Sequence, residues 1–234
     1  MTAMFFEYGS KETDWLSRRD KHMAQAIAHF GILRRGMMPD LFAALVRNIV
    51  DQQISTKAGL TVNARLLALA GSVTPQRLEA LPAQAIQDCG VSMKKALYIK
   101  GAASAAMSGE LDLSAIHQAS DEQVIANLSR LPGIGVWTAE MLMIFSLGRP
   151  DVLSWGDLAI RRGMMHLYRH KTLPRDRFER YRRRYAPMVA SRRFICGPCL
   201  RRIMRRGWRQ SNPRRSKLRR GPAPDHGRAA SYHH

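Results

Sequence analysis

The chain has 234 residues, of which 45% are hydrophobic and 24% are charged, and this composition excludes a wholly disordered protein. Lys and Arg total 38 against 18 Asp and Glu, so the net charge of +20 indicates a polyanionic partner, either nucleic acid or an anionic membrane surface. The cysteines Cys89, Cys196 and Cys199 are too few for a disulfide scaffold or a cysteine-ligated metal site, and they fit a reducing cytosol. We expect no signal peptide and no membrane span, because no apolar run is long enough.

Apolar residues recur with helical spacing along nearly all of residues 1–187. The pattern is clearest in residues 41–52, 59–69, 97–106 and 134–147, and a polar helix is predicted over 120–130. Prolines punctuate these segments, often near a helix start. No stretch alternates apolar and polar residues with the β-branched enrichment of a strand. The sequence therefore predicts an all-α protein of roughly eight to ten short helices without a significant sheet.

Residues 131–139 read LPGIGVWTA and lie between two predicted helices. Glycines two positions apart allow a tight turn and a close approach of the backbone to a ligand. The helix that follows would present N–H groups and the positive end of its dipole, which suits a DNA phosphate. A bare G-x-G would favour a plain helix–helix turn, but the longer pattern is more specific. The backbone residues expected at the phosphate are Gly133, Ile134, Gly135 and Thr138.

Asp157 stands where the apolar loop of the segment DVLSWGDLAIRR, residues 151–162, becomes a helix. Taken alone, this position favours a helix N-cap, because a carboxylate there accepts the first N–H groups and meets the dipole favourably. A catalytic role is compatible with the cap, since capping fixes the carboxylate in place.

Residues 131–162 together resemble the helix-hairpin-helix, Gly/Pro-rich loop and aspartate signature of the DNA glycosylase superfamily, and the most similar branch is DNA-3-methyladenine glycosylase II. Residues 41–55, LFAALVRNIVDQQIS, resemble the first core helix of that family, and residues 90–99, GVSMKKALYI, resemble its GxSxxKxxYI segment. The likeness covers about residues 10–187. It implies a two-lobed helical fold with the hairpin at the cleft between the lobes, but without the N-terminal β-domain of some members.

The resemblance implies that the protein removes alkylated purines of the 3-methyladenine type from double-stranded DNA, as a cytoplasmic, nucleoid-associated monomer without a required cofactor or iron–sulfur cluster. It implies that Asp157 is the catalytic carboxylate, since breaking an N-glycosidic bond builds positive charge on the sugar, which a nearby anion stabilises. Lyase-capable relatives carry a Schiff-base lysine two positions after the second hairpin glycine. Trp137 stands there in this sequence, which predicts a monofunctional glycosylase that leaves an abasic site.

Further site residues are expected from the same resemblance. Trp137 and Trp155 would line the base pocket, where an indole suits a cationic flipped base, although Trp137 without the family context would be assigned to the core. Gln52 and Gln53 stand where relatives fill the gap left by the flipped base, the alternative being two surface glutamines. A monovalent cation is expected on the backbone carbonyls of Ser129, Leu131 and Gly133. Independently of the resemblance, the basic side chains of Lys94, Lys95, Arg161 and Arg162 are candidate contacts to phosphate, the alternative being solvated helix faces.

Two other function classes fit parts of the pattern. The hairpin and the basic charge also fit a non-catalytic helix-hairpin-helix DNA-binding protein. A bifunctional glycosylase and abasic-site lyase for oxidised bases is disfavoured by Trp137 and by the missing cysteine cluster.

The predicted glycosylase domain covers residues 1–187, and residues 188–234 form a basic tail that we expect to be disordered. Back-translation of residues 188–199, read one base out of frame, permits GSVASLYLWAL, which is similar to the helix that usually follows in the family. We therefore predict that a one-base frameshift near Met188 produced the tail. The alternative is a native basic arm that binds DNA non-specifically.

Overall fold

The computed structural model of the chain describes residues 4–6, 8–32 and 35–187, so the predicted tail lies outside the described residues. The described part contains 12 α-helices and one isolated bridge, between Phe5 and Gly36, which confirms the all-α fold. The predicted number of helices was too low. Three helices of 6 residues each make fewer than two turns, too short for a clear apolar period.

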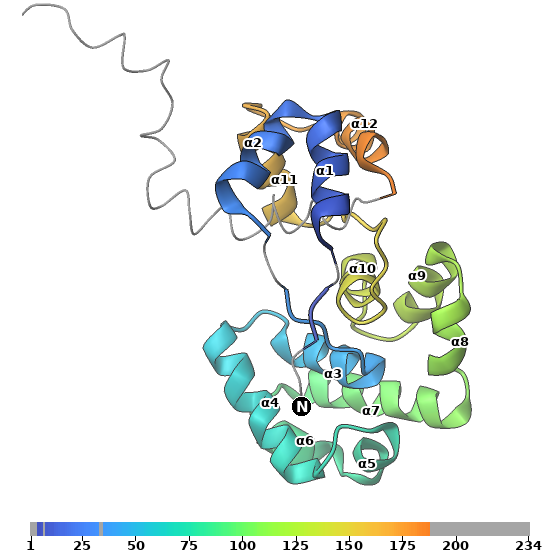
Figure 1. Cartoon of the computed structure of the whole chain (residues 1–234). Helices are drawn as coiled ribbons and strands as arrows, with labels where there is room; N and C mark the ends of the chain where they lie inside the picture. The colour runs from blue at the N-terminus through green and yellow to red at the C-terminus, as the bar shows by residue number, and fades with distance from the viewer. Residues whose placement is uncertain (1–3, 7, 33–34, 188–234) are drawn as a thin grey trace, which may run out of the picture.

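Eight helices surround the larger core, which Figure 1 shows in the lower part of the molecule. Leu45, Ile49, Ile99 and Ile144 are completely buried there. Most of these helices begin at a Ser, Thr or Asp whose side chain accepts a first-turn N–H group, as N-cap preferences predict. They are α3 (Leu41–Asp51), α4 (Thr56–Ala70), α5 (Pro75–Ala80), α6 (Ala83–Asp88), α7 (Met93–Ser108), α8 (Leu113–Gln118), α9 (Asp121–Ser129) and α10 (Val136–Phe145).

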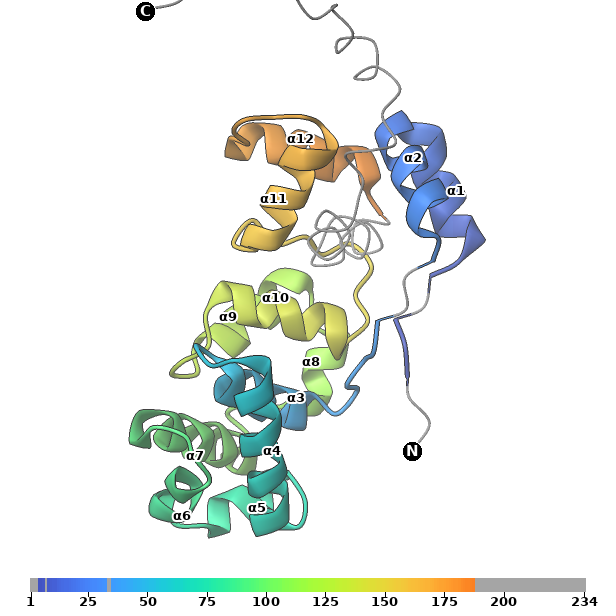
Figure 2. The same cartoon turned by 90° about the vertical axis from the view of Figure 1, so that its left-hand side faces the viewer.

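The smaller core lies among four helices from the two ends of the described chain. These are α1 (Ser10–Arg19), α2 (Lys21–Phe30), α11 (Leu158–Leu167) and α12 (Arg175–Tyr185). Leu16, Met23, Met164 and Phe178 are completely buried among them. Figures 1 and 2 both show this group above the other eight helices, which confirms the two-lobed arrangement.

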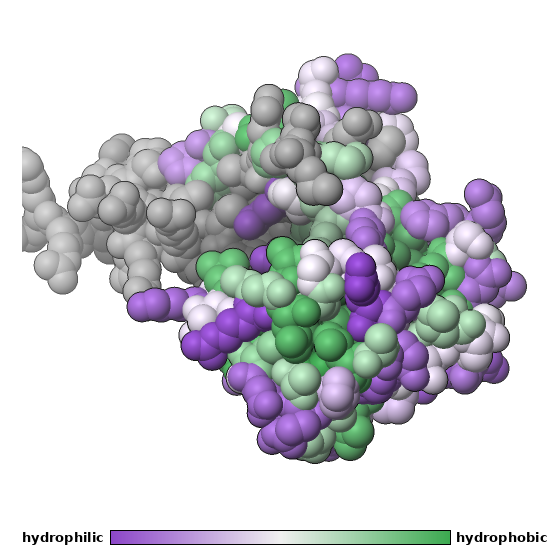
Figure 3. All heavy atoms as spheres, turned by 90° about the horizontal axis from the view of Figure 1, so that it is seen from below, coloured by the Kyte–Doolittle hydropathy of each residue, from purple (hydrophilic) through white to green (hydrophobic). Residues whose placement is uncertain are grey.

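The chain passes between the lobes before α1, where Phe6 packs in the larger core, again between α2 and α3, and again between α10 and α11. Seen from below, the larger lobe presents apolar side chains in the middle of its face and polar ones around them (Figure 3). Within the described ranges, no helix combines the length and apolar character needed to cross a membrane.

A buried carboxylate joins α2 to α11 and α12. Asp20 is 5% exposed and caps α2 by accepting two of its backbone N–H groups. It also accepts hydrogen bonds from the hydroxyl of Tyr168 (2.9 Å), the hydroxyl of Tyr185 and the guanidinium of Arg184 (3.1 Å). Burial alone would raise the pKa of Asp20, but the bonds from both tyrosines and the α2 amides outweigh it and lower the pKa below its ordinary value of 3.8.

Replacing this carboxylate tests its contribution to the smaller lobe. We expect Asp20→Asn to lower the free energy of unfolding at neutral pH by about 1–3 kcal/mol, because the amide cannot accept all these bonds. The folded pKa lies below the unfolded one, so the contribution is present above about pH 4 and is lost as the pH falls through the folded pKa. Urea denaturation of both proteins measures the difference.

The control is Asp176→Asn, which removes an exposed carboxylate 3.5 Å from Arg180 on α12. This change should alter stability by less than about 0.5 kcal/mol. A difference between wild type and Asp20→Asn that stays constant from pH 7 to pH 2 would contradict the account.

Candidate active site and DNA-binding face

The first turn of α10 faces solvent without a side-chain cap. Gly135 is the N-cap residue and has no side chain to accept an N–H bond, while Val136 and Trp137 are 53% and 44% exposed. The helix begins two residues later than the sequence predicted. Ile134 and Thr138, expected at a phosphate through their backbone, are each only 5% exposed. This helix end has the form of an anion site.

Gly133 fixes the path of the hairpin. Its φ of 84° lies in the left-handed region, and a Cβ there would overlap the ring of Tyr98 on α7. Its carbonyl oxygen accepts a hydrogen bond of 2.8 Å from Nε2 of Gln52, at the end of α3. The hairpin is therefore set between α7 and α3, and Figure 2 shows the α9–α10 turn beside the α3–α4 connection.

The structure gives the two glutamines different positions. Gln52 is half-buried and bonds the hairpin, whereas Gln53 is exposed at the tip of the turn. Gln53 has a φ of 58°, which is uncommon for a residue other than glycine and costs about 1 kcal/mol or more. Sequence spacing could not separate them, because the partner of Gln52 lies 81 positions away.

Lys95, a candidate phosphate contact, instead bonds the end of α3. Its Nζ donates to the carbonyl oxygens of Val50 (2.8 Å) and Gln52 (2.5 Å). Burial lowers the pKa of Lys95, and the nearby charge of Asp51 partly opposes that shift. The neighbouring Lys94 is exposed, with its Nζ 5.8 Å from the ring centre of Tyr98.

Asp157 is the N-cap of α11, as its position in the sequence predicted. Its Oδ1 accepts the backbone N–H groups of Ala159 (2.8 Å) and Ile160 (3.0 Å), and the residue is only 7% exposed. A carboxylate bound twice by one helix end has a fixed orientation. Asp157 therefore places a carboxylate of fixed orientation at the start of α11.

The loop before Asp157 brings it to the start of α10. Ser154 is completely buried, and its Oγ has no hydrogen-bond partner among the described residues. A Cβ built on Gly156 would lie 3.5 Å from Cβ of Trp137, so this part of the loop packs directly against the Trp137 side chain. The loop that ends at Asp157 therefore lies against the first turn of α10, which carries Trp137.

Trp155 packs against the smaller lobe. Its ring meets Phe178 of α12 edge to face, with centres 5.1 Å apart, and the guanidinium carbon of Arg161 lies 4.9 Å from its centre. Arg161, a candidate phosphate contact, thus covers a tryptophan. The expected pairing of Trp155 with Trp137 in one pocket stays a prediction.

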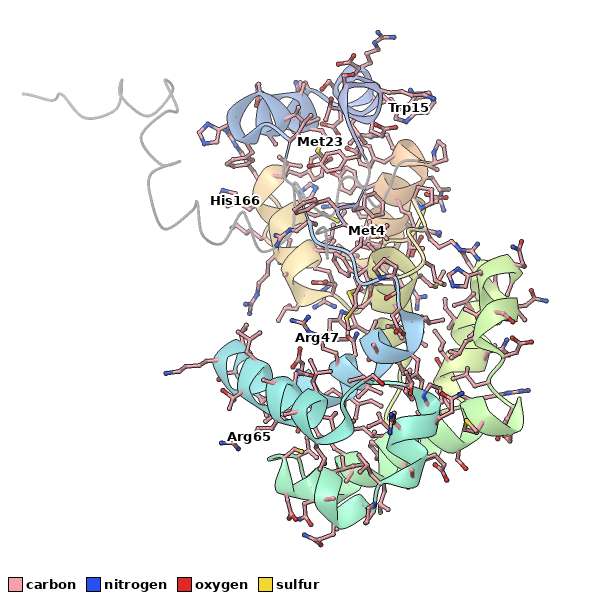
Figure 4. The ribbon with its side chains drawn as sticks, turned by 60° about the horizontal axis from the view of Figure 1, so that its bottom comes forward. Met4, Trp15, Met23, Arg47, Arg65 and His166 are labelled. Atoms are coloured by element: carbon pink, nitrogen blue, oxygen red, sulfur yellow. The ribbon has the colours of Figure 1, made fainter. Side chains whose placement is uncertain are left out.

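A hollow of about 440 Å³ lies between α3, α10 and residues 36–38. Met141 lines it and follows Trp137 by one helical turn, so the two side chains share one face of α10. Figure 4 shows Arg47, another lining residue, between the two groups of helices. This hollow was not expected from the sequence, where the methionines Met37, Met38 and Met141 would have been its signal.

The structure offers little for a bound metal. Among the residues described, no three His, Cys, Asp or Glu side chains lie close enough together to hold an ion. Of the carbonyls expected to bind a monovalent cation, that of Gly133 accepts from Gln52, and that of Leu131 accepts from the N–H of Ile134 at 3.1 Å. These oxygens already have donors, so the cation stays a prediction and no chemical step depends on it.

Residues 46–187 match the family described as HhH-GPD superfamily base excision DNA repair protein. DNA-3-methyladenine glycosylase 1 of Schizosaccharomyces pombe is 30% identical over 158 residues, which are 66% of this chain and 69% of that protein. DNA-3-methyladenine glycosylase 2 of Escherichia coli is 30% identical over 151 residues, but the match spans only 53% of its length.

Two solved structures have the same fold. The DNA-3-methyladenine glycosidase of Bacillus halodurans is 33% identical with a TM-score of 0.72, over 82% of this chain and 90% of that one. The 3-methyladenine DNA glycosylase of S. pombe, solved with abasic DNA, is 28% identical with a TM-score of 0.71, over 80% and 95%. With the family match covering most of the chain and the hairpin and aspartate in place, this protein belongs to the HhH-GPD superfamily of base excision DNA repair proteins.

Proposed function

We propose that this protein is a monofunctional DNA glycosylase that hydrolyses the N-glycosidic bond of alkylated purines, chiefly 3-methyladenine, in duplex DNA. The observation that carries the proposal is Asp157, a buried carboxylate fixed by two backbone N–H groups in the turn that packs on Trp137. The relatives named as 3-methyladenine glycosylases support the substrate class.

Asp157 would act through its charge. As the bond between base and sugar breaks, positive charge grows on the sugar, and an anion already oriented beside it stabilises that charge without reorganising. The two N–H bonds from α11 supply this orientation. An alkylated purine is itself cationic and leaves readily, so no second carboxylic acid is needed to protonate it. Water completes the hydrolysis and leaves an abasic site.

Trp137 and the hollow beyond it would receive the flipped base. The face of the indole would attract a cationic ring through cation–π interaction. The polarisable thioethers of Met37, Met38 and Met141, which line the hollow, would contact the same ring. A volume of about 440 Å³ lies within the usual range for small-molecule sites. The half-exposed indole is accessible to such a ligand.

The first turn of α10 would bind a DNA phosphate through the backbone N–H groups that follow Gly133 and Gly135. Of the two glutamines, Gln53 would enter the gap in the base stack, because it is exposed whereas Gln52 bonds the hairpin. Extrusion costs less when alkylation has weakened the stacking and pairing of the base.

Exchanging the carboxylate for an amide tests the proposal. We expect Asp157→Asn to reduce release of 3-methyladenine from methylated duplex DNA by about 100-fold or more, because the transition-state charge loses its anion. The fold and DNA affinity should be retained, since asparagine also caps helices. Chromatography of the released bases measures the rate, and fluorescence anisotropy measures binding.

The competing functions predict other results. If the wild-type protein and the Asp157→Asn variant both bind DNA and neither releases a base, the result favours a non-catalytic DNA-binding function. A covalent protein–DNA adduct trapped by borohydride would favour the lyase, which forms a Schiff base.

A second prediction concerns the hairpin. We expect Gly133→Ala to lower the free energy of unfolding by about 1–3 kcal/mol and to weaken DNA binding about tenfold or more, because its φ is positive and its Cβ overlaps Tyr98. Gly101→Ala is the matched control, since Gly101 lies within α7 outside the hairpin, its φ is not positive and nothing lies within 4 Å of the added Cβ. Equal effects of the two substitutions on stability and binding would refute the assigned role of Gly133.

A further inference from the structure

The end of α3 lacks the usual means of termination. No basic residue lies in its last turn, Asp51 places a negative charge at the negative end of the dipole, and the described backbone shows no N–H bond from the C-cap residue Gln52. The carbonyl oxygens of Val50 and Gln52 therefore depend on another group. Lys95 is that group, and it comes from α7, 43 positions after Gln52.

The bonds from Lys95 continue to the hairpin. Lys95 fixes the backbone of Gln52, and the side chain of Gln52 donates to the carbonyl of Gly133. Gly133 in turn packs on Tyr98, which lies on α7 one turn after Lys95. The result is a closed circuit of contacts from α7 to α3, to the hairpin and back to α7.

Gln53 follows immediately after this fixed point. A residue other than glycine keeps a left-handed conformation only when its surroundings determine it, and the side chain of Gln53 is exposed. The constraint on the turn therefore comes from Gln52. Its backbone carbonyl accepts a hydrogen bond from Lys95, and its side-chain amide donates one to the hairpin.

We propose that Lys95 is a positioning residue for base extrusion, which fixes the α3–α4 turn so that Gln53 can occupy the gap opened in the base stack. This inference rests on the proposed function. The two bonds of Lys95 hold the end of α3, directly before Gln53, so we assign its contribution to opening the duplex and not to breaking the glycosidic bond.

Lys100 provides a matched control on the same helix. Its Nζ also donates to a backbone carbonyl, that of Glu79 on α5, and lies 3.5 Å from the Glu79 carboxylate. Lys100→Met removes the same type of bond as Lys95→Met but leaves the turn and the hairpin intact. A purely structural role for Lys95 predicts that the two variants behave alike.

The experiment compares two duplexes that differ only in the cost of extrusion. A pyrimidine strand with one adenine is methylated with dimethyl sulfate while paired with its complement, which shields N1 of adenine and N3 of cytosine. It is then purified and re-annealed to a strand with either thymine or cytosine opposite that adenine. Release of free 3-methyladenine is followed under single-turnover conditions with saturating enzyme. A mismatched base costs less to extrude, so a variant that is impaired in opening the duplex should lose less of its rate on the mismatched duplex than on the matched one.

We expect Lys95→Met to slow release from the matched duplex by about tenfold or more and from the mismatched duplex by less than about threefold. Lys95→Arg, which keeps charge and donors, should restore most of the rate. Lys100→Met should leave the ratio of the two rates unchanged. Because this ratio is measured within one protein sample, partial unfolding of a variant does not affect it.

Equal slowing on both duplexes, or none on either, would overturn the role of Lys95. The same conclusion follows if Lys100→Met changes the ratio as much as Lys95→Met does. If the wild-type protein releases no 3-methyladenine from either duplex, the proposed function fails first and the inference fails with it.

Discussion

The site depends on a pair of adjacent residues buried in different cores. Val152 packs in the larger core and Leu153 in the smaller one, each only 5% exposed, so the loop that joins the lobes is anchored from both sides. Successive side chains of an extended segment point in opposite directions, which makes this division possible. Asp157 follows four positions later and begins α11. The place of the carboxylate is thus set by hydrophobic packing in both lobes.

The start of α10 is the point at which the other elements meet. The loop that precedes Asp157 packs on Trp137, and the hairpin before α10 contacts α7 through Gly133 and Tyr98. In the smaller lobe, Asp20 bonds Tyr168, which stands at the C-terminal end of α11. Both ends of α11 therefore have specific polar partners. An electrostatic mechanism needs this rigidity, because a charge that must reorient stabilises a transition state less.

Features that depend on neighbouring residues in the chain could be predicted from the sequence. The helical period gave the fold class, and an aspartate between an apolar loop and the segment LAI predicted the N-cap at residue 157. The need for glycine at 133 was expected from its pattern, although the contact with Tyr98 that enforces it was not.

Features that depend on distant partners could not be read from the sequence. Lys95 was expected to contact phosphate, with a solvated helix face as the alternative, and only the fold brings the end of α3 to it. The hollow between α3 and α10 arises from segments about 100 residues apart, such as those of Met37 and Met141. Helices of 6 residues were missed because so short a segment shows no clear period.

The most direct test is the identity of what leaves the DNA. Methylated duplex DNA is incubated with the protein, the free bases are separated by chromatography, and the strands are sized before and after alkaline cleavage. The account predicts free 3-methyladenine and strands that break only after alkali treatment, which reveals intact abasic sites. Absence of released base, or strand breakage without alkali, would contradict it.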